Sequence, residues 1–233
     1  MRVSGALLLA LIVCPACIAI PVPPPDPPPL GSATDIDGNV YPTVVIGNQE
    51  WMAVNLKTTR YNDGTAIQNV TDPGAWNTLS PAYCWYDNDI ANKDLYGALY
   101  NWHTIYYLDQ QDKICPPNFY LPSSDTWRAL VDALGGSVAG GALKEAGTSH
   151  WDAPNTGATN HSGFTGLPAG YRDSDGTFNA KGQFSFGWCS DQDFLAFVSS
   201  YWGLEDTNAT SLGGSSPWED GYSIRCMRAV TPD

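Results

Sequence analysis

After the first thirty residues, apolar and polar positions begin to alternate, which is typical of strands with one buried face. Residues 35–47 read as a turn followed by a strand, and residues 50–56 form a second strand. Gly47-Asn48 stands at the bend between them, so the sequence predicts a β-hairpin. Residues 61–65 form another tight turn, and residues 68–83 are rich in turn formers, which predicts an irregular loop.

Apolar positions then change to helical spacing. Residues 95–108 place large apolar side chains on one helix face, namely Leu95, Leu99, Trp102, Ile105 and Tyr106. A second helix is predicted to begin at Ser123 or Ser124 and to end at Gly135-Gly136. Its apolar positions are Trp127, Leu130, Val131 and Leu134.

The C-terminal part returns to strand patterns at residues 164–171, 183–189, 194–202 and 222–230. In the last of these segments alternate residues are apolar, and Arg228 interrupts the pattern. Two short helices followed by a cluster of strands predict an α+β fold. We expect the helices to pack on small twisted antiparallel sheets joined by long irregular loops.

The N-terminus has the three parts of a secretory signal: Arg2, an apolar stretch over residues 6–13, and small residues after it. Cleavage is predicted after Ala19, with cleavage after Ala16 as the alternative. Proline fills most of residues 21–29 and favours an extended polyproline conformation. The sequence therefore predicts a signal peptide over residues 1–19, a spacer over residues 20–33 and one domain over residues 34–233, secreted or at the cell surface.

The same region leaves the mode of attachment open. A lipid anchor at Cys14 or Cys17 is the alternative to free secretion. The apolar stretch of residues 6–13 is too short to span a bilayer, since a spanning helix needs about 20 residues. No other segment is apolar enough, so no transmembrane segment is predicted.

Charge narrows the choice of partner. The chain has 11 Lys and Arg against 24 Asp and Glu, a formal net charge of -13. Nucleic acids and anionic membrane surfaces are poor partners, because both are bound by clustered basic residues. Neutral glycans, cations and basic proteins remain compatible with this charge.

Four cysteines lie outside the signal region, at Cys84, Cys115, Cys189 and Cys226. In an oxidising compartment an even number predicts two disulfides, with three pairings open. No two of the four have the close spacing of a zinc knuckle, so a structural zinc site is not expected.

Several motifs carry a resemblance to one family. They include Asp35-Ile-Asp-Gly-Asn-Val-Tyr, Trp51-Met-Ala-Val-Asn-Leu, Tyr83-Cys-Trp-Tyr-Asp-Asn-Asp, Tyr96-Gly-Ala-Leu-Tyr-Asn-Trp, Leu167-Pro-Ala-Gly-Tyr-Arg and Ser223-Ile-Arg-Cys-Met-Arg. In order and spacing, from about Asp35 to Ala229, the chain resembles the Fibrobacter succinogenes major paralogous domain. That family resembles the superfold of C-type lectins and formylglycine-generating enzymes. The resemblance implies a C-type-lectin-like fold and a Cys115–Cys226 bridge, and it leaves Cys84–Cys189 as the second bridge.

Calcium binding would need several oxygen ligands converging at one point. The candidates are Asp87 and Asp89 in a loop, and Glu219 and Asp220 after Trp218, where C-type lectins carry a Trp-Asn-Asp element. The Glu-Pro-Asn motif of those lectins has no counterpart here. The other interpretation of these carboxylates is that they are solvated turn residues, so no cofactor is expected and calcium stays an alternative.

Nine Trp and twelve Tyr could stack on sugar rings or anchor a protein partner. Trp51, Trp102 and Trp127 lie in patterned apolar segments and are expected in the core. Candidates for ligand binding are Tyr201, Trp202, Trp218 and Asp220, in the C-terminal third.

A catalytic site is not predicted, because His103, His150 and His161 show no metal spacing. A copper or redox enzyme related to formylglycine-generating enzymes is a remote alternative, since their late cysteine motif is missing. The expected function is a non-catalytic binding module, with an extracellular glycan as ligand. A structural or adhesive surface protein that binds other proteins is the alternative.

Overall fold

The computed structural model describes residues 31–106 and 113–230, so the predicted signal peptide, Cys14, Cys17 and most of the spacer lie outside the described residues. The strands are β1 (Gly31–Thr34), β2 (Val40–Ile46), β3 (Gln49–Met52), β4 (Gln68–Asn69), β5 (Ala82–Cys84), β6 (Leu99–Tyr100), β7 (Tyr171–Arg172), β8 (Phe178–Asn179), β9 (Phe184–Asp193), β10 (Val198–Glu205), β11 (Leu212–Pro217) and β12 (Met227–Ala229). The helices are α1 (Pro73–Trp76), α2 (Lys93–Tyr96), α3 (His103–Tyr106), α4 (Ser124–Ala133) and α5 (Ala139–Leu143), with 3-10 turns at Tyr86–Asn88, Ile90–Asn92 and Gly136–Val138. Strand β1, the first described element, begins at Gly31 and lies inside the range predicted for the spacer.

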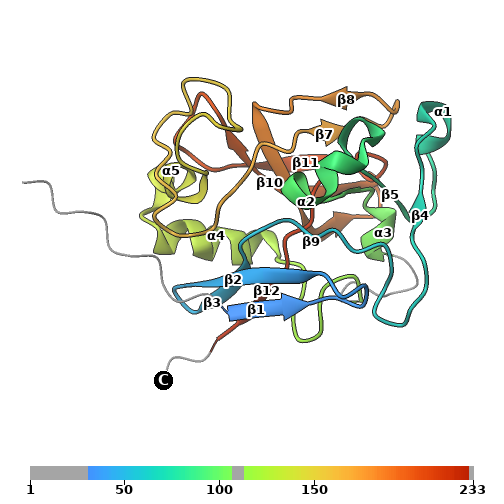
Figure 1. Ribbon diagram of the computed structural model, residues 1–233, viewed down its shortest axis with the longest axis horizontal. Helices are drawn as coiled ribbons and strands as arrows, with labels where there is room; N and C mark the ends of the chain where they lie inside the picture. Colours follow the sequence, from blue (N-terminus) through green and yellow to red (C-terminus); the bar gives the residue numbers. More distant parts are fainter. Residues whose placement is uncertain (1–30, 107–112, 231–233) are drawn as a thin grey trace, which may run out of the picture.

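The first sheet joins the two ends of the described chain. Its strand order is β1-β2-β3-β12, and every pair in it is antiparallel (Figure 1). Strands β2 and β3 form the predicted hairpin, with Gly47 at φ +62° in its bend. Strand β12 completes the sheet beside β3, so residues almost 180 positions apart, such as Glu50 and Arg228, lie next to each other.

The second sheet has the order β11-β10-β9 and presents two different faces. Side chains alternate along β10, so Trp202 points to helix α4, where it stacks on Trp127 with ring centroids 4.5 Å apart. Tyr201 points the other way and contacts Phe186. Trp127 also meets Trp51 of β3 at 5.8 Å, so α4 is packed between the two sheets (Figure 1).

The remaining sheets are small. Strands β4, β5 and β6 form one of them, in which β4 and β5 are parallel, and β7 pairs with β8. Short helices on several small and mostly antiparallel sheets make this an α+β fold, as the sequence predicts. In the described part of the chain, no helix is long and apolar enough to cross a membrane.

Helix α4 confirms the second predicted helix. Ser123 is its N-cap, and the side-chain oxygen accepts from the backbone N–H of Thr126 at 3.1 Å. The helix is followed by Gly135 with φ +97°, a conformation that glycine adopts without a Cβ penalty.

The predicted helix over residues 95–108 is wrong. Helix α2 ends at Tyr96, strand β6 follows, and α3 is a separate helix. Gly97 has φ +75°, and a Cβ there would lie 2.8 Å from the Cβ of Asn55. Tyr100 then pairs with Tyr222 through two backbone hydrogen bonds, which hold the segment extended. The chain turns here because distant segments bind its backbone, although the apolar spacing is helical.

Two predicted strands are also shorter than expected. Residues 164–170 are irregular, with positive φ at Thr165 and Gly170, and only Tyr171 belongs to a strand. In the last segment regular pairing is confined to β12, although Tyr222 and Ser223 make single bridges to other segments. Residues 222–227 are all buried, so the apolar alternation in this segment does not correspond to a strand with one buried face.

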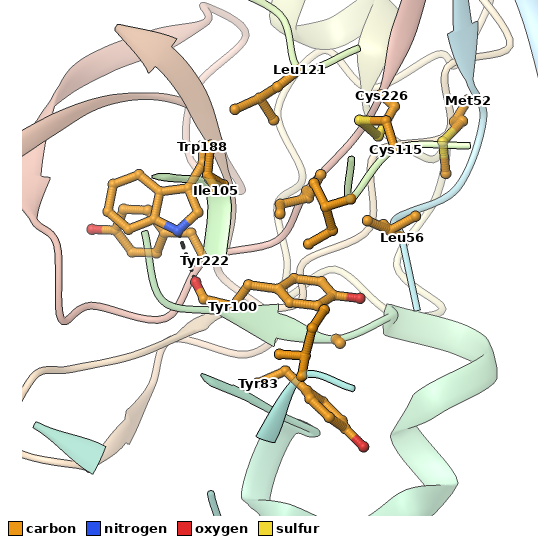
Figure 2. Close-up of a cluster of buried hydrophobic side chains, with 14 of the residues drawn as sticks. Met52, Leu56, Tyr83, Tyr100, Ile105, Cys115, Leu121, Trp188, Tyr222 and Cys226 are labelled. Atoms are coloured by element: carbon orange, nitrogen blue, oxygen red, sulfur yellow. Dashed lines mark hydrogen bonds between the residues drawn. A yellow bond between two sulfur atoms is a disulfide. The ribbon is translucent and has the colours of Figure 1, made fainter. Parts of the chain in front are cut away.

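The central core contains the Cys115–Cys226 disulfide, with Cα atoms 5.8 Å apart, as the family resemblance implies. Figure 2 shows it beside Met52 and Leu56 at one side of the cluster, while Trp188 and Tyr222 lie at the other. The Trp188 indole donates to the backbone oxygen of Tyr100 at 2.8 Å, which satisfies its buried N–H (Figure 2).

The second predicted bridge, Cys84–Cys189, is wrong. Both cysteines are free and buried. Cys84 packs with Trp76 in one hydrophobic cluster, while Cys189 packs with Trp202 in another. Desolvation by burial raises the pKa of each thiol to about 12, so neither is a reactive thiolate at neutral pH.

Candidate functional site

Two of the predicted ligand-binding aromatics are core residues. Trp202 is 0% exposed and stacks on Trp127, and Trp218 is 5% exposed and stacks on Trp102 with centroids 4.8 Å apart. A sugar ring needs an open aromatic surface, and neither indole offers one. The prediction that these two residues form a binding surface is therefore wrong.

Tyr201 has a different environment, because it belongs to a partly open group of rings that we call the aromatic face. Its members are Tyr171, Phe184, Phe186, Tyr201 and Tyr222. Phe186 lies at the centre, with ring centroids 5.7 Å from Tyr171, 5.2 Å from Phe184 and 5.2 Å from Tyr201. Phe186 and Tyr222 are buried, while the other three rings are half-buried and reach the surface.

The strands explain how these rings come together. Phe184 and Phe186 are two positions apart in β9, so they point to the same side of the sheet. Tyr201 reaches this side from β10, which has an irregular register between Ser199 and Tyr201. Its partner in β11 is Gly214, where a Cβ would lie only 2.7 Å from the Tyr201 hydroxyl oxygen. Glycine therefore lets the phenol lie across the edge strand.

Asp220 borders the aromatic face through a hydrogen-bond network. Its Oδ2 accepts from the Ser216 hydroxyl at 2.6 Å, and its Oδ1 accepts from the backbone N–H of Ser174 at 3.0 Å. The Ser216 hydroxyl also lies 2.8 Å from the Tyr222 hydroxyl, and the Tyr222 ring is 5.4 Å from Tyr201. Of the four predicted ligand-binding residues, the structure thus brings Tyr201 and Asp220 together.

Burial controls the charge of this carboxyl group. Desolvation raises the pKa of Asp220 to about 6, although the hydrogen bond from Ser216 works in the opposite direction. The nearby charge of Asp173 raises it further. The site therefore offers a carboxyl group that changes protonation close to neutral pH, next to three half-exposed rings.

The sequence model of the Fibrobacter succinogenes major domain matches residues 44–228. The chain belongs to this family. The match begins at Val44, after the motif at residues 35–41, and it includes the whole aromatic face and the β9–β10–β11 sheet, whereas β1 and the first part of β2 lie before it. No curated protein and no solved structure matches this Fibrobacter succinogenes major domain.

The four weak calcium candidates do not converge in this major domain. Asp89 accepts from the backbone N–H of Ala91 at 2.9 Å, and Asp87 is exposed in a left-handed turn with φ 54°. Glu219 faces His103, with Oε1 3.6 Å from Nε2, while Asp220 belongs to the network above. Within residues 31–106 and 113–230, no three His, Cys, Asp or Glu side chains are grouped so that they could hold a metal ion.

Sequence reasoning missed Tyr171, Phe184 and Phe186 as site residues. A signal for two of them exists, because Phe184-Ser-Phe186 is a strict alternation that puts two rings on one side of a predicted strand. Tyr171 gives no such signal. It joins the face only because β7 contacts β9 in the folded domain.

The raised pKa of Asp220 predicts a pH dependence of stability. The native major domain binds this proton more tightly than the unfolded chain, whose pKa is near 3.8. The stabilising contribution is therefore complete below about pH 4 and is lost as the pH rises through about 6. We expect Asp220→Asn to remove this component, which is about 1–2 kcal/mol after allowance for partial solvation.

The measurement is urea unfolding of the wild type and Asp220→Asn at pH 4.5 and pH 7. The wild type should lose more stability than the variant between the two values, because other carboxyl groups contribute equally to both proteins. An equal pH dependence would show that Asp220 has an ordinary pKa. Asp132→Asn, which removes an exposed carboxyl group on α4 that does not act on Asp220, is the control and should keep the pH dependence of the wild type.

Proposed function

We propose that this domain is a non-catalytic binding module outside the cytoplasm, and that its aromatic face holds a neutral polysaccharide. The observation that carries the proposal is the group of three half-buried rings, Tyr171, Phe184 and Tyr201, around Phe186. Flat rings fixed by core contacts bind at little entropic cost, because their side chains are already ordered in the free protein.

Charge supports a neutral ligand. The chain carries 24 acidic residues against 11 basic ones, and the carboxyl groups of Asp173 and Asp220 lie near the phenol of Tyr171. An anionic ligand would be repelled there. Hydroxyl groups of a sugar could instead donate to the carboxylates and accept from the phenols, which are the usual polar contacts beside an apolar stacking surface.

The N-terminal sequence and the disulfide support the proposal that the domain is exported. Residues 1–19 have the form of a secretory signal, and the Cys115–Cys226 bridge is a type of bond that persists in oxidising compartments. The family resemblance adds a C-type-lectin-like arrangement, and the first sheet, in which β1 and β12 flank β2 and β3, is compatible with it. Secretion with or without a lipid anchor at Cys14 or Cys17 fits the proposal equally well.

Affinity electrophoresis tests the glycan proposal. The exported protein should be retarded in gels that contain one of a panel of soluble neutral polysaccharides: dextran, starch, mannan, xylan and mixed-linkage β-glucan. Tyr201→Ala should weaken the binding roughly tenfold, equivalent to about 1.4 kcal/mol, because it removes one stacking ring. Tyr201→Phe should keep most of the affinity, since it keeps the ring.

The matched control is Phe194→Ala, which removes an exposed ring whose contacts are with Tyr106 and Trp218, away from the aromatic face. Each gel is run with calcium and with a chelator, so that a calcium-dependent site would be detected. Absence of retardation in every polysaccharide would rule out the glycan proposal. Equal losses of affinity in Tyr201→Ala and Phe194→Ala would show that the polysaccharide does not bind at the aromatic face.

A second candidate is a surface protein that binds other proteins. It is favoured by an apolar tip between β9 and β10, made of Phe194, Leu195 and Phe197, of which Leu195 is 95% exposed. Large exposed apolar side chains that adjoin one another are typical of protein interfaces. If the partner is a protein that binds this tip, Phe194→Ala should weaken its binding and Tyr201→Ala should not.

A further inference from the structure

The opposite face of the β9–β10–β11 sheet holds a groove of about 410 Å³, which we call the α4 groove. One wall is helix α4, whose residues 124, 127, 128 and 131 follow one another on a single helix face. The other wall is formed by small residues of the strands and of the turn before β11, namely Cys189, Ser200, Ser211, Gly213 and Ser215. This volume is in the range of small-molecule sites, which is about 300–1,000 Å³.

The strand register places these small residues side by side. Ser200 is paired directly with Ser215, and Trp202 with Gly213, so two rows of side chains cross the sheet toward α4. Trp202 fills the space under Trp127. The side chains of Ser200 and Ser215 are much shorter than the indole, so the space above them forms the groove. Tyr201 also borders the groove, but its ring contacts Phe186 and Tyr222 on the other face.

The residues that line the α4 groove carry a net positive charge, unlike the protein as a whole, and the carboxylates of Asp125 and Asp191 lie just outside the lining. Arg128 lines the groove, and the lining residues include no Asp or Glu. The Arg128 side chain is 68% exposed, and its salt bridge to Asp125 is a surface pair at i,i+3, with Nη1 and Oδ1 2.8 Å apart. Such pairs contribute little, so Arg128 can exchange this contact for a ligand carboxylate.

The hydroxyl groups in the groove are also available. In the described chain, the hydroxyls of Ser200 and Ser215 form no hydrogen bond with another residue, and both side chains are at least partly exposed. The Ser211 oxygen accepts from the Trp127 indole at 2.8 Å and keeps its own proton to donate. One guanidinium and three hydroxyls beside the apolar wall of α4 match a ligand that carries one carboxylate and several hydroxyl groups.

We propose that the α4 groove is a second ligand site, which binds a carboxylated sugar residue of the uronate type. The carboxylate pairs with Arg128, and the sugar hydroxyls bind Ser200, Ser211 and Ser215. The site is separate from the aromatic face, because the two lie on opposite sides of the same sheet. Its ligand is distinguished from a neutral glycan by a single charged group.

An NMR titration with two matched sugars tests this proposal. Methyl β-D-glucuronide and methyl β-D-glucoside differ only in a carboxylate that replaces a hydroxymethyl group. The glucuronide should shift the backbone amide signals of residues 200 and 211–215 in the isotope-labelled full chain and bind at least tenfold more tightly than the glucoside. Arg128→Gln should bring both sugars to the same weak affinity, with an unchanged spectrum elsewhere because the side chain is at the surface.

Asp125→Asn is the control variant, because it removes the partner of Arg128 without changing a residue of the groove, and it should leave the affinity for glucuronide equal or higher. The proposal is overturned if the glucuronide shifts no groove signal, if the glucoside binds as tightly, or if Arg128→Gln keeps the difference between the sugars. Sodium acetate that competes as well as the glucuronide would show that only a carboxylate is recognised, and would overturn the sugar assignment. Phe184→Ala removes a ring of the aromatic face that does not line the groove, and it should not affect this titration, so failure here and failure of the glycan proposal are distinguishable.

Discussion

Replacing Trp202 with alanine is expected to lower the free energy of unfolding by about 3–5 kcal/mol, the usual cost of deleting a fully buried indole. The side chain is 0% exposed and stacks on Trp127 between α4 and the second sheet. It also lies so close to β9 that a Cβ on Gly187 would meet its ring. Truncation therefore leaves a cavity that rigid strands and a packed helix cannot close.

The adjacent residue provides the control. Tyr201→Ala removes a half-buried ring from the other face of the same strand and should cost only about 1–2 kcal/mol. Urea unfolding of both variants, with Trp202→Phe as an intermediate that fills most of the space, gives the comparison. If Trp202→Ala keeps wild-type stability and loses a ligand instead, the indole is a binding residue and its assignment to the core is wrong.

The contrast between these neighbours shows what the sequence could predict. Tyr201 and Trp202 both follow a turn-rich segment and both are aromatic, so sequence reasoning placed them together on a binding surface. Their separation depends on which face of β10 meets α4. That choice is made by Trp127, 75 positions earlier, and a strand pattern taken alone contains no information about it.

Elements encoded by local signals were predicted well. The β2–β3 hairpin depends on its turn residues, and α4 on its cap at Ser123. The helix prediction for residues 95–106 was wrong because distant segments bind the backbone there, as in the pairing of Tyr100 with Tyr222. Tertiary contacts of this kind override helical spacing.

The burial of three positively charged side chains could not be predicted from the sequence. Lys144 donates to the backbone oxygens of Thr156, Glu205 and Asn208 at 2.7–2.9 Å, and these contacts tie separate loops together. Arg172 and Arg225 are likewise buried, and each donates to backbone oxygens and lies over aromatic rings. A charged residue in an irregular segment is normally expected at the surface. Here the irregular loops need donors for their own carbonyl groups, and these three side chains supply them.

Removing the Cys115–Cys226 bridge is expected to lower the free energy of unfolding by about 3–5 kcal/mol. The bond closes a loop with a sequence separation of 111, and the loss of chain entropy in the unfolded state grows with loop length. It also ties the segment before β12 to the middle of the chain at the edge of the main core (Figure 2). The test variant is the double substitution Cys115→Ala/Cys226→Ala, measured by urea unfolding without reductant.

The matched control is Cys84→Ala/Cys189→Ala, which removes two buried thiols and no covalent bond, so it should cost only about 1 kcal/mol per site. Reductant should destabilise the wild type and this control equally, and should leave the first variant unchanged.

Alkylation of the unreduced, denatured chain followed by peptide mapping should label Cys84 and Cys189 and leave the other two peptides joined. A Cys84–Cys189 peptide pair in that map would contradict the separation of these thiols in two hydrophobic clusters. Burial raises the pKa of each of these two thiols to about 12 and so suppresses the thiolate that thiol exchange needs.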